Sequence, residues 1–338
     1  ELKSKYADAR RTRIIQLKEG EKASQLLTQT DVMPLENFWV EINAEGFISR
    51  TEDDKPNRLG GENAPWSILR TNSHQTLFLV TPEGQAAAIH MLSIPVQRGE
   101  EPTTPVHKLS PLSEDEVVQA AFAIPIEKND IGERYVLTVT RQGMIKKSLV
   151  TELPGASANR FTLVKVNEGD ELFRVLLTDG KQEVLLTTAK GMSIRFSETD
   201  VRPMGLLAAG VNGIKLKEGD YVVGASLIEA GNEVGLVTNQ GWAKRIKAEE
   251  FPQQGRYGQG VISWKLKGED SIVVQLCGKL TDRGVCHFRK SASKVFTLTN
   301  AVERTRQANG QILFKLKPDD ELIGFTCLDD FSSYWEKA

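Results

Sequence analysis

The sequence predicts an all-β fold of six four-stranded units arranged radially, a propeller-type architecture. The first observation is a phrase that returns every fifty residues: VKVNEGDELF, IKLKEGDYVV, WKLKGEDSIV and FKLKPDDELI begin at residues 164, 214, 264 and 314. The second is a short turn motif that precedes each copy. The third is the alternation of apolar and polar residues, which excludes solenoids of helices.

The repeated phrase predicts a strand, a turn and a second strand. Apolar residues flank a lysine in each copy, so a period of two places the apolar pair on one face of a strand and the lysine on the other. The lysines are Lys165, Lys215, Lys265 and Lys315. An acidic turn follows, with an aspartate at the same offset in each copy: Asp170, Asp220, Asp270 and Asp320.

The turn motif predicts a second hairpin in each unit. VTPEG, VTRQG, TTAKG and VTNQG share a Thr-x-x-Gly pattern, and INAEG near the start of the chain is a looser relative. Such a turn favours glycine at its last position, where φ is positive. Two hairpin elements give about four strands per unit. We expect units at residues 31–75, 76–130, 131–180, 181–231, 232–280 and 281–330, the sixth without the turn glycine.

The ends of the chain depart from the repeat. Residues 1–30 contain many charges, with no glycine before position 20, and predict a helical lead-in from a neighbouring domain. Because the chain begins with Glu1, we expect it to be a fragment of a longer protein. Residues 331–338 form a short tail.

Composition excludes several classes of protein. In the 338 residues, 40% are hydrophobic and 26% charged, as in folded globular proteins, and no apolar run is long enough to cross a membrane. Three cysteines and four histidines are scattered without metal-ligand spacing. No carboxylate pair or Ser/His set predicts catalysis. We therefore expect no enzymatic activity, cofactor or membrane partner for this chain alone.

The net charge of −2 argues mildly against a nucleic-acid partner, but the cations are sorted by position in the repeat. A cation stands four residues after most turn glycines, and two units add a lysine one place earlier. Loop arginines follow, including Arg98 and Arg306. In a ring, equivalent positions describe a circle, and a circle of cations predicts a curved track for duplex DNA. The alternative is a protein-binding propeller whose cations are merely solvated, with Trp66, Trp242 and Tyr257 as contacts.

Three stretches resemble the third, fourth and fifth blades of the C-terminal domain in the family of A subunits of DNA gyrase and topoisomerase IV. They are GMIKKSLVTEL, VLLTTAKGMSIRFSETDVRPMGLLAAGVNGIKL and GWAKRIKAEEFPQQGRYGQGVISWKL. KYADARRT, at residues 5–12, is similar to the end of the breakage-and-reunion domain that precedes it.

The resemblance implies a six-bladed β-pinwheel with strands exchanged between blades. Its basic rim would wrap DNA and support ATP-dependent supercoiling by a holoenzyme. The domain itself would hold no cofactor, although the holoenzyme would use ATP and Mg. Its partners would be duplex DNA, the rest of the A subunit, and the ATPase B subunit in a heterotetramer, in the cytoplasm of a bacterium at the nucleoid.

One motif departs from the family. Gyrases carry a box similar to Q-R-R-G-G-K-G, where this chain has NRLGGEN at 57–63, with Leu59 in place of an arginine and Glu62 in place of a lysine. This difference favours weaker wrapping, and keeps open a topoisomerase IV-like domain that binds DNA without wrapping it fully. The residues expected to contact DNA are Arg50, Arg58, Gly60, Gly61, Lys146, Lys147, Arg160, Arg195, Arg202, Lys244, Arg245, Arg256 and Arg304.

Overall fold

The computed structural model describes residues 29–99, 102, 104–128, 131–157 and 159–336. Contacts between residues divide the chain into two units, with the boundary between Leu35 and Glu36. In the first unit the described element is helix α2 (Gln29–Val32). The rest of the predicted helical lead-in, residues 1–28, lies outside the described residues.

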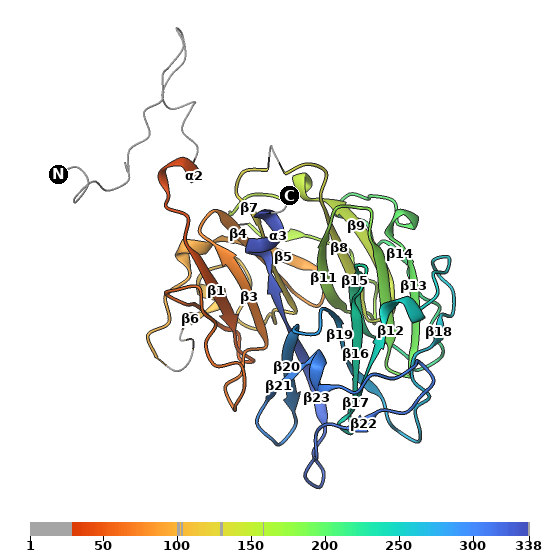
Figure 1. Cartoon of the computed structure of the whole chain (residues 1–338). Helices are drawn as coiled ribbons and strands as arrows, with labels where there is room; N and C mark the ends of the chain where they lie inside the picture. The colour runs from red at the N-terminus through yellow and green to blue at the C-terminus, as the bar shows by residue number, and fades with distance from the viewer. Residues whose placement is uncertain (1–28, 100–101, 103, 129–130, 158, 337–338) are drawn as a thin grey trace, which may run out of the picture. The chain divides into compact units, whose positions relative to one another are not determined.

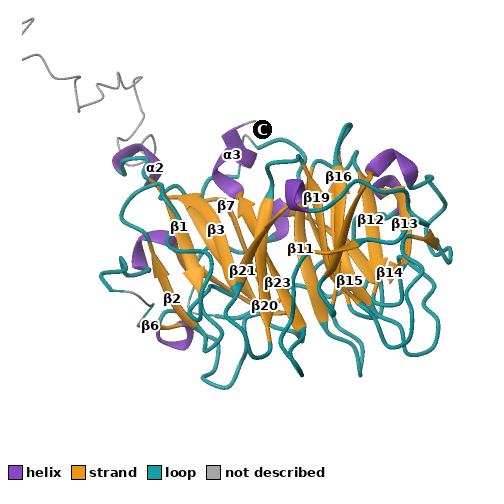
Figure 2. Ribbon diagram, turned by 60° about the horizontal axis from the view of Figure 1, so that its bottom comes forward, coloured by secondary structure: helices purple, strands orange, loops and turns teal. Residues whose placement is uncertain are grey.

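The second unit is built of strands joined by turns and single-turn 3-10 helices (Figure 1; Figure 2). Four sheets have four strands each, which pair in the following order: β7 (Ala120–Pro125), β4 (Gln75–Val80), β5 (Gln85–His90) and β10 (Phe161–Thr162); β11 (Leu172–Thr178), β8 (Tyr135–Thr140), β9 (Met144–Leu149) and β14 (Val211–Asn212); β15 (Val222–Ile228), β12 (Glu183–Thr188), β13 (Met192–Ser197) and β18 (Val261–Ile262); β19 (Ile272–Gly278), β16 (Glu233–Thr238), β17 (Trp242–Lys247) and β22 (Gln311–Ile312).

The fifth sheet has seven strands. Its order is β21 (Lys294–Thr297), β20 (Arg283–Phe288), β23 (Leu322–Asp330), β3 (Ser67–Asn72), β1 (Asn37–Ile42), β2 (Phe47–Arg50) and β6 (Thr104–Pro105). The 3-10 helices are η2 (Met91–Ser93), η3 (Val106–Lys108), η4 (Val150–Glu152), η5 (Glu198–Asp200), η6 (Ala248–Glu250) and η7 (Leu298–Asn300), and the chain ends in helix α3 (Phe331–Glu336).

The seven-stranded sheet consists of the first and last repeat units joined edge to edge, so the second unit has six blades. Strands β3, β7, β11, β15, β19 and β23 each contact the next in this order, and β23 contacts β3. These six are the inner strands of blades 1 to 6, and they close a ring. The all-β, propeller-like fold class predicted from the sequence is confirmed.

Each of the first five blades takes its outermost strand from the chain of the following blade. Strands β6, β10, β14, β18 and β22 have two residues each and pair antiparallel with β2, β5, β9, β13 and β17. The segment around each repeated lysine, expected to be a strand, is instead an extended connection that follows the exchanged strand. The predicted alternation holds in burial, since Ile214 is buried and Lys215 is exposed.

The turn glycines are required where an exchanged segment crosses the hairpin. Gly191 and Gly241 have φ of +85° and +78°, a conformation that favours glycine. A Cβ on either residue would also stand 2.3 Å from a backbone oxygen of the next blade, that of Trp264 or Phe314. Any side chain at these positions would push the exchanged segment off the blade.

The repeated aspartates fix the same turns from the other side. A carboxylate oxygen of Asp170 accepts from the backbone N–H of Gln142 at 2.9 Å, Asp220 from Lys190 at 3.0 Å, and Asp320 from Lys290 at 2.9 Å. The acidic turn therefore satisfies a backbone donor that the hairpin leaves without a partner.

Blades 6 and 1 are joined by a parallel strand pair and a single bridge in place of an exchanged strand. Strand β23 pairs in parallel with β3, with Leu328 opposite Ile68, and Figure 1 shows these blue and orange strands side by side. At the rim, Gly61 and Ser293 form an antiparallel bridge with N···O distances of 2.9 and 3.0 Å. Segment 57–63 thus occupies the place of the exchanged strand in blade 6. At this junction the glycines lie on the incoming segment, which explains why the sixth hairpin has none.

Leu59 packs in the seam between blades 1 and 6. It is 8% exposed and shares a small apolar cluster with Ala64, Ile68 and Val285. An arginine at this position would have to bury its charge or displace the segment. The change that distinguishes this box therefore exchanges a cation for an apolar contact that closes the ring.

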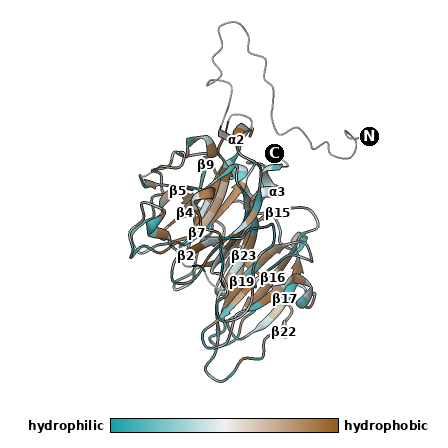
Figure 3. Ribbon diagram, turned by 90° about the vertical axis from the view of Figure 1, so that its left-hand side faces the viewer, coloured by the Kyte–Doolittle hydropathy of each residue, from teal (hydrophilic) through white to brown (hydrophobic). Residues whose placement is uncertain are grey.

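Apolar residues are frequent along the strands, which are largely brown in Figure 3, and buried clusters of them join neighbouring blades. One cluster, for example, joins Leu137 and Ile145 of blade 3 to Leu186 and Ile194 of blade 4. Every blade is covered on both faces by its neighbours, which explains why many of its strands are buried throughout.

The predicted tail, residues 331–338, contains helix α3, which contacts inner strands β3 and β7. Trp335 Nε1 donates to the carbonyl oxygen of Ala123 at 2.9 Å, and Gln75 Nε2 donates to that of Phe331 at 3.2 Å. On the inner strands, Arg174 of β11 also donates to Asp329 of β23 at 2.7 Å. The C-terminal segment is thus tied to blades 1, 2 and 3.

His287 lies in the seam between blades 6 and 1 and is neutral there. Its ring stacks on Trp66 with centroids 4.4 Å apart, and its Nδ1 and Nε2 lie 3.0 Å from Ser293 Oγ and 2.8 Å from Thr326 Oγ1. Thr326 donates its hydroxyl proton to Trp66 O, so Nε2 is the donor to Thr326 and Nδ1 accepts from Ser293. Burial lowers the pKa of His287 to about 4.

We expect acid to weaken the domain through His287. The unfolded imidazole takes a proton near pH 6.5 and the folded one near pH 4, so stability is complete above pH 6.5 and is lost as the pH falls toward 4, by up to about 3 kcal/mol. The measurement is urea unfolding at pH 7 and pH 4.5 for the wild type and His287→Gln. The variant should lose less stability between the two pH values. An equal loss in both proteins would contradict the assignment.

Candidate nucleic-acid interface

Four of the predicted contact residues join neighbouring blades. Arg50 Nε donates to Ile94 O at 3.0 Å, and Lys147 Nζ donates to Glu198 O at 3.0 Å. The equivalent Arg195 and Arg245 donate to Ala248 O at 3.1 Å and Ala301 O at 3.0 Å. Each acceptor lies in or directly after the 3-10 turn of the following blade. The four cations therefore hold that turn in place.

Their charges are largely compensated or buried. Arg195 Nε lies 2.7 Å from a carboxylate oxygen of Glu183, and an Arg245 terminal nitrogen lies 2.5 Å from one of Glu233. Lys147 is 4% exposed, with its ammonium over the ring of Tyr135, and burial lowers its pKa. The structure places these residues between blades, with Lys147 buried and the three arginines half-buried.

Lys146 and Lys244 are also internal, at 1% and 0% exposure. Lys146 Nζ donates to Leu163 O at 2.6 Å and Leu206 O at 2.7 Å. Lys244 Nζ donates to Arg306 O at 2.7 Å and Ala308 O at 2.8 Å. Burial lowers the pKa of both lysines to about 8. They anchor the loops that form the outer edge of blades 3 and 5.

We call those outer loops the rim segments. Each runs from a 3-10 turn to the exchanged strand, and 57–63 fills the equivalent place in blade 6. The rim segments are 95–105, 153–162, 201–212, 251–262, 301–312 and 57–63.

Every rim segment carries at least one arginine. The rim arginines are Arg58, Arg98, Arg160, Arg202, Arg256, Arg304 and Arg306. The first four are exposed, and the others are half-buried because they also bind backbone oxygens, as Arg306 does at Ile262 O, 2.9 Å away. In the sequence the acids of these segments are Glu62, Glu100, Glu101 and Glu303, against seven arginines. Cations thus predominate along the described rim.

The predicted site residues therefore separate into two groups. The rim group contains Arg58, Gly60, Gly61, Arg160, Arg202, Arg256 and Arg304, whereas the inner group contains Arg50, Lys146, Lys147, Arg195, Lys244 and Arg245. Of the rim group, Arg160 is ion-paired with Glu116 at 3.0 Å.

The repeated lysines are cations that sequence reasoning did not include in the site. Lys165, Lys215, Lys265 and Lys315 are all exposed, and each directly follows a rim segment and its short connection. The backbone N–H of Lys215 donates to Gly258 O at 2.9 Å, and that of Lys165 to Ala208 O at 3.2 Å, so both lie beside the rim loops. The fifty-residue spacing of these lysines is the sequence pattern that could have identified them.

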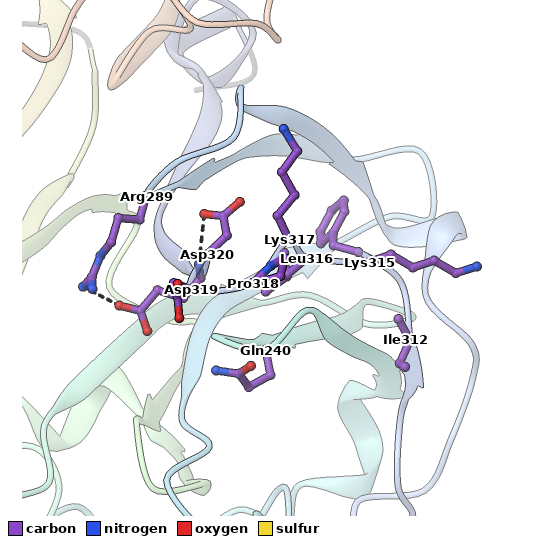
Figure 4. A pocket seen from close by; sticks show the side chains of 11 residues that line it. Gln240, Arg289, Ile312, Lys315, Leu316, Lys317, Pro318, Asp319 and Asp320 are labelled. Atoms are coloured by element: carbon purple, nitrogen blue, oxygen red, sulfur yellow. Dashed lines mark hydrogen bonds and ion pairs between the residues drawn. The ribbon is translucent and has the colours of Figure 1, made fainter.

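A cleft of about 820 Å³ lies between blades 5 and 6, lined by both signs of charge (Figure 4). Lys315 and Lys317 line it together with Asp319 and Glu321, and Glu321 is ion-paired with Arg289. Nowhere in the described parts of the chain do three His, Cys, Asp or Glu side chains gather to hold a metal ion. Nor do the described residues include a helix long and apolar enough to cross a membrane.

Replacement of Lys244 tests the anchoring role. Lys244→Met should lower the free energy of unfolding by about 2 kcal/mol, because it removes charged hydrogen bonds from loop carbonyls. The matched control is Lys247→Met on the same strand. The Lys247 ammonium is exposed and forms a long surface ion pair with Glu303, at 3.7 Å. Its replacement should lower the free energy of unfolding by less than about 1 kcal/mol. Chemical denaturation of both variants gives the comparison, and equal costs would refute the anchor.

The geometry agrees with comparisons to known proteins. Residues 134–179, 182–229, 233–274 and 294–329, just over half of the chain, match the family described as DNA gyrase C-terminal domain, beta-propeller. The DNA gyrase A subunit of Halalkalibacterium halodurans is 30% identical over 226 residues, which are 63% of this chain and 26% of that protein. The chain thus spans about a quarter of the length of such relatives.

Solved structures give the same result. The C-terminal domain of DNA topoisomerase IV is similar with a TM-score of 0.73 and 25% identity, over 86% of this chain and 93% of that one. A DNA gyrase A C-terminal domain has the same fold, with a TM-score of 0.68 and 21% identity, over 87% and 100% of the two chains. Exchanged strands, a closed ring of blades and the matched segments together show that this chain belongs to the family of DNA gyrase C-terminal domains.

Proposed function

We propose that this chain binds duplex DNA along its rim and bends it, as the accessory domain of a gyrase-like protein. The observation that supports this proposal is the distribution of the rim arginines, at least one on each of six successive rim segments. A duplex carries one negative charge per about 1.7 Å of its axis, so repeated cations along a curved edge would hold it at many points. Distributed contacts of this kind offset the cost of bending, which is a few kcal/mol for a short site.

The inner cations would serve the same function indirectly. Arg195 and Arg245 fix the 3-10 turns from which the rim segments start, while Lys146 and Lys244 anchor the loops that follow. They would keep the rim arginines at a constant spacing without touching phosphate themselves. Contacts made by preorganised side chains lose less conformational entropy on binding.

The segment 57–63 would bind DNA weakly. Arg58 is exposed, but Leu59 is buried in the seam and Glu62 is exposed, so the segment offers one cation and one anion. Phosphate binding scales with the number of cations. Arg98 of blade 1 is likewise followed in the sequence by Glu100 and Glu101. The domain would therefore hold DNA through blades 2 to 5 more than through blades 6 and 1, as in a topoisomerase IV-like domain that binds without full wrapping.

In the complete protein the domain would act with partners. The rest of the A subunit would join the ATPase B subunit in the holoenzyme, which would use ATP and Mg to change DNA topology in the bacterial cytoplasm at the nucleoid. The domain would guide the duplex and take no chemical step itself. Its function would therefore be measured as DNA binding and not as enzymatic turnover.

The salt dependence of DNA binding tests the proposal. If seven rim arginines each neutralise one phosphate, log K should fall against log salt with a slope near −6, and Arg202→Ala should make that slope shallower by about 0.9. Fluorescence anisotropy with a labelled duplex gives both values. Lys181→Ala, an exposed cation outside the rim segments, is the charge-matched control and should leave the slope unchanged. Binding that does not depend on salt concentration, or an equal change of the slope in the two variants, would favour a protein-binding scaffold.

A further inference from the structure

Two large side chains project from equivalent points on adjacent rim segments. Leu207 is 76% exposed and Tyr257 is 49% exposed, and they stand fifty residues apart in the repeat. The corresponding residues on the flanking rim segments are the exposed, polar Ser157 and Gln307. Single exposed apolar residues are ordinary on protein surfaces, but these two recur at the same repeat position of adjacent rim segments that each carry arginine.

The backbone at Tyr257 is held in a strained conformation. Its φ is +66°, and among the described residues only Tyr257 and Asp319 combine a side chain with positive φ. The strand beneath this loop also differs from its counterparts in the neighbouring blades. Blades 3 and 5 use Lys146 and Lys244 to bind rim carbonyls, whereas blade 4 has Ile194 at that position. A Cβ on Gly258 would lie 3.3 Å from the Ile194 side chain, so the loop packs against it closely.

Backbone hydrogen bonds hold the loop at Tyr257 and at the residue that follows it. The backbone N–H of Tyr257 donates to Gly213 O at 2.8 Å, and Gly258 O accepts from the N–H of Lys215 at 2.9 Å. The backbone around Tyr257 is therefore held by the neighbouring segment, and its side chain is half exposed. Strain held by surrounding structure at an exposed residue points to a function for that residue.

Both rim segments that carry these tips also carry an arginine. Arg202 is exposed on the segment of Leu207, Arg256 directly precedes Tyr257, and Lys215 lies beside the Tyr257 loop. A protein partner would be matched by a broad apolar surface, whereas these two side chains stand on segments whose charged residues are the arginines Arg202 and Arg256. This pattern is typical of proteins that insert an apolar wedge between base pairs and kink the duplex.

We infer that Leu207 and Tyr257 are wedges that enter partly unstacked base steps and set the bend of DNA on blades 3 and 4. This inference rests on the proposed DNA binding and adds a specific source of curvature to it. The arginines supply affinity, and the two tips supply kinks at the spacing of one blade.

The test measures bending and affinity separately on the full chain. A duplex with a donor and an acceptor dye at its ends reports bending by energy transfer, and anisotropy at several salt concentrations reports phosphate contacts. The variants are Leu207→Ala and Tyr257→Gly, because glycine accepts the positive φ and keeps the loop folded. The matched control is Gln307→Ala at the equivalent position of blade 5.

We expect each wedge variant to lose about a quarter of the energy transfer gained on binding and the double variant about half, because the rim arginines still bend the duplex and keep the salt slope unchanged. Gln307→Ala should bend DNA as the wild type does. Full bending by the double variant would overturn the wedge while leaving DNA binding intact. Absence of salt-dependent binding by the wild type would overturn both.

Discussion

Blades 1 to 5 each receive a two-residue strand from the next blade along the chain, and this strand pairs with their outer strand. The rest of the second unit depends on this exchange. The exchanged strand covers an edge that would otherwise leave backbone donors and acceptors exposed. To reach it, the chain must cross the neighbouring hairpin, which requires the turn glycines, and must then return to the inner strand, which creates the repeated lysine connection. The rim segments exist because the chain has to travel outward from one blade to the next.

The same exchange sorts the cations. Residues on the strand under a rim segment face backbone oxygens of that segment, so Arg195, Arg245, Lys146 and Lys244 are drawn inward as anchors. Residues on the segment itself have solvent on one side, and there the arginines remain available. A net charge near zero is thus compatible with a basic edge, because acids concentrate in the turns after the repeated lysines and in pairs with the inner arginines, whereas arginines outnumber acids along the rim segments.

The fold could be predicted from the sequence because each feature of the repeat reflects a constraint on neighbouring residues. The fifty-residue spacing, the turn glycines and the apolar alternation each report a constraint that acts within one hairpin. Three features could not be read in this way. Ring closure through Gly61 and Ser293 joins residues more than two hundred positions apart, burial of Lys244 depends on carbonyls of a loop sixty residues later, and the positive φ of Tyr257 has no counterpart at the equivalent Leu207 and Gln307. Cations on inner strands and on the rim look alike in sequence, which explains why the predicted site contained both.

The proposed function requires that the rim arginines, and not the inner cations, meet DNA. Arginine-directed chemical modification with mass-spectrometric readout, carried out on the free chain and on the chain saturated with duplex, tests this requirement most directly. We expect Arg58, Arg98, Arg160 and Arg202 to react when the chain is free and to be protected by DNA, while Arg195 and Arg245 react slowly in both states. Protection of Arg195 and Arg245 with unchanged reactivity along the rim would contradict it.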